Sequence, residues 1–157
     1  STFGRRYMAE FDAAFDAEDK PRMLALLEGD SLPSFPDSPT AVNDTDGRKI
    51  LFSNAPRHYT KAVLELTGLG RHFDAVYTVE SLRFRPKPMP EGFRALLRAE
   101  GLRARDCIMV EDSLPNLVTA KKLGMKTVWI NGGRRQSPFV DVHINSVLQL
   151  PSRCGRL

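Results

Sequence analysis

The chain has 157 residues, of which 23 are Lys or Arg and 19 are Asp or Glu, giving a net charge of +4. Apolar residues make up 41% of the chain, and no apolar run approaches the ~18 residues of a membrane span, which excludes a membrane protein. The length suits one domain that needs no disulfides or structural metal. The 2 cysteines have neither zinc nor disulfide spacing, so we expect a reducing, cytoplasmic compartment.

The N-terminal part of the chain is acidic. Residues 1–47 carry 4 basic and 10 acidic side chains, whereas residues 48–157 carry 19 and 9. Residues 1–30 have apolar side chains at helical spacing, which predicts two short amphipathic helices. Residues 31–47 are rich in Pro, Ser and Asp and predict an irregular connection. We therefore predict a helical segment at 1–46 and a main domain at 47–157.

From Lys49 onward, short apolar runs alternate with segments of helical periodicity. The runs are residues 50–52, 75–79, 107–110 and 127–130, and residues 140–144 are a candidate last strand. The helical segments are residues 57–67, 90–100 and 114–123, and each ends near a glycine. This alternation predicts an α/β fold, in which helices cover both faces of a parallel sheet in a three-layer, Rossmann-like α/β/α arrangement.

Ligands of such sheets bind beyond the carboxyl ends of the strands, so the residues after each apolar run are the candidate site. Ser53 and Asn54 follow the first run, where they suit either phosphate binding or helix capping. Lys87 stands between two prolines, where its ammonium group suits a phosphoryl oxygen. The alternative for Lys87 is a solvated side chain in a proline turn.

Two adjacent carboxylates, Glu111 and Asp112, follow the third run. They would repel each other at the end of a buried strand unless a cation or a proton relieved the repulsion, and Mg²⁺ is the simplest cation. The alternative is a helix start with Asp112 or Ser113 as the N-cap and Pro115 in the first turn. Capping and metal binding can also occur together.

Ser53-Asn54, Lys87 between prolines, and Glu111-Asp112-x-x-x-Asn116 resemble, in this order, three motifs of the haloacid dehalogenase (HAD) superfamily, and more closely its pyrimidine 5′-nucleotidase branch. The resemblance implies a HAD-like core that hydrolyses a small phosphorylated substrate, such as a pyrimidine nucleotide, with Mg²⁺. It implies that Ser53, Asn54 and Lys87 bind the substrate, with Ser53 and Lys87 catalytic. It assigns the metal to Asp112 and Glu111, with Ser113 and Asn116 in support.

The nucleophile that the resemblance implies, an Asp-x-Asp pair after the first strand, is not found. Asp44-Thr45-Asp46-Gly47 has the right letters, but only 6 residues separate Asp46 from Ser53, too few for a crossover between parallel strands. We interpret it as a polar turn. The expectation is a truncated enzyme with little activity of its own, consisting of a remnant of a helical cap at 1–46 and a core without its first strand.

A different class of function remains open, namely a non-catalytic anion-binding or protein-interaction module. Such a protein would self-associate or bind a partner strand at the vacant position in its sheet. The basic body suits an anionic ligand, although a solvated basic surface explains the charge more simply than a nucleic-acid interface does. We expect no membrane partner.

Overall fold

The computed structural model describes residues 47–130, 136–154 and 157. The strands of these residues are β1 (Ile50–Phe52), β2 (Ala75–Tyr77), β3 (Ile108–Glu111), β4 (Lys126–Ile130) and β5 (Val142–Ile144). The α-helices are α4 (Arg57–Thr67), α5 (Pro90–Ala99), α6 (Leu114–Lys122) and α7 (Leu150–Cys154). The predicted helices of residues 1–30, the connection after them and the boundary at 46 lie outside the described residues.

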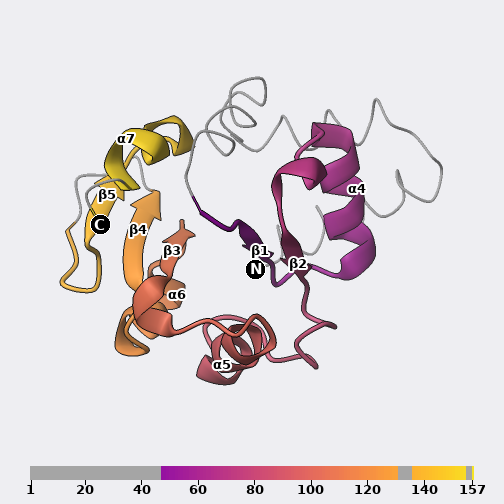
Figure 1. The fold of residues 1–157 in the computed structure, drawn as a ribbon, viewed down its shortest axis with the longest axis horizontal. Coiled ribbons are helices and arrows are strands. Elements are labelled where there is room, and N and C mark those ends of the chain that lie inside the picture. Colours follow the sequence, from indigo (N-terminus) through magenta and orange to yellow (C-terminus); the bar gives the residue numbers. More distant parts are fainter. Residues whose placement is uncertain (1–46, 131–135, 155–156) are drawn as a thin grey trace, which may run out of the picture.

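All strand pairs are parallel, which confirms the prediction of an α/β fold. The strands form two sheets, one of β1 and β2 and one with the order β3-β4-β5. Figure 1 shows them side by side, with β1 next to β3, α5 and α6 below the strands, α7 above β4 and β5, and α4 to the right of β2. The predicted strand of residues 75–79 is shorter than expected, because the chain turns after Tyr77.

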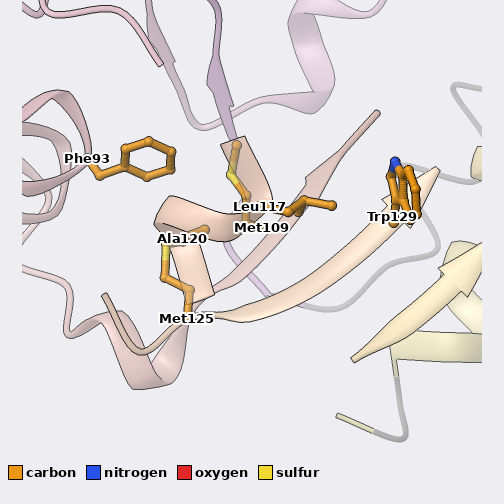
Figure 2. Packing of buried hydrophobic residues seen from close by; sticks show 6 residues of the cluster. All are labelled: Phe93, Met109, Leu117, Ala120, Met125 and Trp129. Carbon is orange, nitrogen blue, oxygen red and sulfur yellow. The ribbon is translucent and has the colours of Figure 1, made fainter. Parts of the chain in front are cut away.

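Two clusters of buried residues hold helices against opposite faces of the β3-β4-β5 sheet. One cluster contains Phe93, Met109, Leu117, Ala120, Met125 and Trp129 and joins α5 and α6 to the sheet (Figure 2). The other joins α7 to the sheet through Val128, Ile144 and Leu150. Neighbouring residues of β4 enter different clusters because side chains alternate along a strand. Both faces are therefore covered, as the near-continuous apolar runs predict.

The helix ends follow the glycine signals of the sequence. Helix α4 ends at Gly68, which has the left-handed φ of 67° that favours glycine, and the N–H of Gly68 donates to the carbonyl of Glu65. Helix α6 begins after Ser113 with proline in its first turn. None of the helices in the described ranges is long and apolar enough to cross a membrane.

Candidate active site

The side chain of Lys87 reaches across the carboxyl ends of the two sheets. Its Nζ lies 2.5 Å from Oε2 of Glu111, the last residue of β3, and the two side chains are only 10% and 9% exposed. The ammonium group also lies over the ring of Phe52, 5.0 Å from its centroid. This burial rules out the solvated lysine that a proline turn alone would suggest. Lys87 is instead a charged link between β1 and β3.

Asn54 holds the main chain of Lys87 in place. Its Oδ1 accepts a hydrogen bond from the N–H of Lys87 at 2.7 Å, and its Nδ2 donates to the carbonyl of Lys87 at 2.8 Å. The loop after β1 is therefore tied to the loop after β2, although the two residues lie 33 positions apart in sequence. Because both polar atoms of the side chain are engaged with Lys87, the structure favours a positioning role for Asn54 over substrate contact.

Ser53 follows β1 directly and stands at the same end of the sheet. Its N–H donates to the carbonyl of Tyr77 at 2.8 Å, and its Oγ accepts from the N–H of Ala55 at 3.0 Å. The hydroxyl therefore points along the loop that leads into α4 and keeps its own proton for another acceptor. Neither Ser53 nor Asn54 is the N-cap of α4, which is Pro56, so the capping interpretation of these residues is wrong.

The carboxylate of Glu80 takes the capping role that the sequence suggested for Ser53 or Asn54. The N–H of Arg57, in the first turn of α4, donates to both oxygens of Glu80 at 3.0 and 3.1 Å. The hydroxyl of buried Thr78 donates to the same carboxylate at 2.7 Å. The bonds from Arg57 and then from Thr78 hold the pKa of Glu80 below its ordinary value. The sequence carried no local signal for this cap, because the two partners lie 23 residues apart.

The neighbouring carboxyl groups of Glu111 and Asp112 influence each other strongly. Burial opposes the charged form of Glu111, but hydrogen bonds from Asp112 and Lys87 outweigh it and lower the pKa of Glu111. The hydrogen bond to Glu111 raises the pKa of Asp112, and burial and the charge of Glu111 act in the same direction. The pKa values of the two adjacent acids are thus shifted in opposite directions, and Lys87 stabilises the charged form of Glu111.

The carboxylates of Glu111 and Asp112 differ in how well they suit Mg²⁺. Oε2 of Glu111 is paired with Lys87, and its Oε1 accepts from the N–H groups of Asp112 and Ser113, each at 3.2 Å. Asp112 carries the carboxyl group that would gain most from a cation. Across the described ranges, no three His, Cys, Asp or Glu side chains gather as a metal site. Mg²⁺ needs only one or two carboxylates when water and phosphate supply its other ligands, so Asp112 fits it.

The two supporting residues lie at the start of α6. Ser113 is the N-cap of this helix, but its side chain makes no capping hydrogen bond. Asn116 is 7% exposed, and its N–H donates to the carbonyl of Ser113 at 3.1 Å. Both therefore shape the turn that carries Asp112. The indole N–H of Trp129 donates to the carbonyl of Asp112 at 2.8 Å and fixes this turn from the neighbouring strand.

A separate groove of about 730 Å³ lies between α4 and the outer edge of β2. Arg57, Lys61, Leu64 and Val76 are among its lining residues, and none of Ser53, Lys87, Glu111 and Asp112 is. We therefore place the candidate site at the strand ends, where Lys87 and Glu111 form their buried ion pair, and not in this groove. Hydrogen bonds join Asn54, Lys87 and Glu111 at these strand ends, and Ser53 and Asp112 are the chain neighbours of Asn54 and Glu111.

Comparison with known proteins gives a consistent family signal. A family model described as haloacid dehalogenase-like hydrolase matches residues 3–124. Human N-acylneuraminate-9-phosphatase is 32% identical over 111 residues, which cover 67% of this chain and 44% of that protein. The GMP/IMP nucleotidase YrfG of Escherichia coli K12 is 29% identical over 113 residues, which cover 72% of this chain and 48% of that protein. The chain thus spans less than half the length of these relatives.

Comparison with solved structures agrees with the match to the family model. A HAD phosphatase from Thermococcus onnurineus superposes with a TM-score of 0.65 at 31% identity, covering 75% of this chain and 55% of that one. A structure described as a dehalogenase superposes with a TM-score of 0.69 over 92% of this chain and 68% of its own. At 20% identity, that second likeness shows the fold alone.

Proposed function

The chain belongs to the haloacid dehalogenase-like hydrolase family, and from this membership we propose that it is the phosphate- and metal-binding part of a Mg²⁺-dependent phosphomonoester hydrolase. The observation that carries the proposal is the buried link from Lys87 to Glu111 beside Ser53 and Asp112. It assembles an ammonium group, a hydroxyl and a carboxylate pair at one end of a parallel sheet. Two of the similar proteins are, by their names, a phosphatase and a nucleotidase.

Each residue then has a role that its contacts support. Ser53 donates its hydroxyl proton to an oxygen of the phosphoryl group, while the N–H of Ala55 keeps the Ser53 oxygen oriented. Lys87 has three N–H donors and gives one of them to Glu111, so the others are available to a phosphoryl oxygen. Asn54 positions Lys87 through its main chain. Phosphoryl transfer needs mainly this kind of positioning and charge stabilisation.

Asp112, supported by Glu111, would hold Mg²⁺, and Ser113 and Asn116 would keep its turn in shape. When bound, the ion supplies positive charge that offsets the negative charge of the phosphoryl oxygens. The same charge would favour the ionised form of Asp112, whose pKa its hydrogen bond to Glu111 raises.

The nucleophile is not assigned. Asp44 and Asp46 lie outside the described residues, and we predict from the sequence that they form a polar turn. Because no apolar strand followed by Asp-x-Asp precedes Ser53, we expect the 157-residue chain to bind phosphate and Mg²⁺ but to hydrolyse little. The preference for pyrimidine nucleotides belongs to the same proposal and rests on the resemblance around residues 50–59 and 110–117.

Metal binding and turnover can be tested separately. Mg²⁺ should raise the melting temperature of the wild-type chain, because a ligand at about tenfold its Kd adds about 1.4 kcal/mol of stability. Asp112→Asn should lose this shift, whereas Asp106→Asn, at an exposed acid paired with Arg103, should keep it. Equal shifts in both variants, or no shift in the wild type, would contradict the metal assignment.

Turnover of p-nitrophenyl phosphate, UMP and GMP with Mg²⁺ should stay near background. Fast hydrolysis that Asp112→Asn abolishes would show that this chain holds a nucleophile after all. A preference for GMP over UMP in such an active protein would contradict the proposed pyrimidine specificity.

A further inference from the structure

The loop that leads from β2 to α5 (Figure 1) holds two successive residues in the left-handed region of backbone space. Arg83 and Phe84 have φ values of 52° and 56°, and neither is a glycine. This conformation is unfavourable for any residue with a Cβ atom and is rare for a bulky side chain. Because backbone strain of this kind gathers at binding and catalytic sites, the loop is a candidate for a role in function.

Phe84 is exposed, although the main chain around it is firmly held. The residue is 71% exposed, the largest value among the exposed large apolar residues in the described ranges. Two positions earlier, Leu82 is only 3% exposed and anchors the loop in the interior. The N–H of Phe84 donates to the carbonyl of Val79 at 2.8 Å, and the N–H of Arg85 donates to that of Leu82 at 3.2 Å. The loop therefore presents an aromatic ring to solvent from a fixed main chain.

Hydrogen bonds connect this loop to the residues that we assign to the phosphate. The N–H of Val79 donates to the carbonyl of Ala55 at 3.5 Å, and the carbonyl of Val79 accepts from Phe84. The N–H of Ala55 in turn donates to the hydroxyl oxygen of Ser53. In the other direction along the chain, only two residues separate Phe84 from Lys87, so their Cα atoms lie at most about 11 Å apart. Phe84 is thus linked over short distances to both Ser53 and Lys87.

Helix α5 packs closely against the segment that follows Phe84. A Cβ atom at Gly92 would lie 2.2 Å from the carbonyl oxygen of Arg85 and 3.6 Å from Cζ of Phe52. The segment therefore runs next to Phe52, whose ring lies 5.0 Å from the ammonium group of Lys87. Both sides of the loop segment that carries Phe84 border the candidate site.

We propose that Phe84 determines substrate specificity by stacking its ring on the base of a nucleoside monophosphate whose phosphate is bound by Ser53 and Lys87. This inference rests on the proposed function and deepens it, because that function assigns residues to the phosphate and none to the rest of the substrate. Aromatic side chains hold nucleobases by stacking, since every base has a π-face. No acidic residue stands within two positions of Phe84, so its neighbours in sequence do not repel an anionic ligand.

A rigid, exposed aromatic ring could also anchor a protein partner. The short links from Phe84 to Ser53 and Lys87 favour a part of the substrate instead, because the phosphate and the base of a nucleotide are only a few bonds apart. Stacking also needs the ring to be held in one place, and the hydrogen bonds of Phe84 and Arg85 supply this order before the ligand arrives.

Calorimetric titration of the 157-residue chain with UMP and with ribose 5-phosphate, both in the presence of Mg²⁺, tests the inference. The two ligands share a phosphate on the same sugar and differ mainly in the base, so the ratio of their dissociation constants isolates the contribution of the base. Stacking predicts that UMP binds about tenfold or more tightly than ribose 5-phosphate does. Equal affinities overturn the inference and leave the proposed function standing, whereas failure of both ligands to bind overturns both.

A pair of glycine variants separates stacking from backbone strain. Phe84→Gly and Arg83→Gly each place a glycine, which tolerates the left-handed conformation, at a strained position, so both variants should fold. Phe84→Gly should abolish the preference for UMP over ribose 5-phosphate. Arg83→Gly is the matched control and should keep the preference, because a lost charge affects both phosphates alike. Phe84→Tyr retains a ring and should also keep it. The inference is overturned if both glycine variants show the same preference or if Phe84→Tyr loses it.

Discussion

Replacing Lys87 by methionine should leave the carboxylate of Glu111 buried without its counter-charge. The two side chains are 10% and 9% exposed and meet at 2.5 Å. Removing one partner of a buried ion pair costs about 3–5 kcal/mol, because the remaining charge has neither water nor a partner. Methionine keeps the apolar stem, so the variant removes mainly the charge.

Two contacts refine this magnitude. The ammonium group also lies over Phe52, and loss of this cation–π contact adds about 0.5–1 kcal/mol. In the other direction, the N–H groups of Asp112 and Ser113 still donate to Oε1 of Glu111 and stabilise the remaining charge. We therefore expect Lys87→Met to lower the free energy of unfolding by about 3 kcal/mol, near the lower end of the range.

A double-mutant cycle separates the pair from the packing around it. Adding Glu111→Gln to Lys87→Met removes both charges and should recover at least half of the loss, since neutral replacement of a buried pair is often tolerated. The control is Lys61→Met, which removes an exposed pair at 3.7 Å with Glu65 and should cost less than about 0.5 kcal/mol.

Urea unfolding followed by the fluorescence of Trp129 measures all of these variants. This single tryptophan is 4% exposed and donates its indole N–H to the carbonyl of Asp112, next to the pair. The reasoning fails if Lys87→Met lies within about 1 kcal/mol of the wild type, the range of ordinary exposed ion pairs. It also fails if the double variant is as unstable as the sum of the two single ones.

Two further predictions concern the supports of the site and of the sheet. Gly92→Ala would place a Cβ 2.2 Å from the carbonyl oxygen of Arg85, so it should cost about 1–3 kcal/mol in urea unfolding, whereas Gly70→Ala, whose nearest neighbour would lie at 3.6 Å, should be close to neutral. Burial opposes the charged form of Asp141, but hydrogen bonds from Lys121 and Thr127 outweigh burial and lower the pKa of this carboxyl group. The ionised Asp141 therefore stabilises the folded protein at pH values above the ordinary pKa of about 3.9. This stabilisation is lost as the pH falls through the lower pKa of the folded protein. The stability difference between the wild type and Asp141→Asn should therefore be constant above about pH 5 and shrink in acid, and a difference that grows in acid would contradict this assignment.

Local pattern determined most of the secondary structure in the described ranges. The predicted strand at residues 50–52 and helix at residues 57–67 agree with β1 and α4 at both ends. Helical periodicity, proline at helix starts and glycine at helix ends act within a few residues, so the sequence alone reveals them. The same holds for the order of the polar residues after the strands, which located the candidate site.

Long-range contacts were decided only by the tertiary structure. Asn54 bonds to Lys87 and not to the start of α4. The carboxylate of Glu80 accepts the hydrogen bond from the first turn of that helix instead. The burial of Lys87 against Glu111 likewise depends on how the two sheets meet. Packing decides which of several residues, distant in sequence, a polar side chain bonds to. The alternative hydrogen bonds of such a side chain are similar in energy. Sequence periodicity contains no information about that choice, because it describes one element at a time.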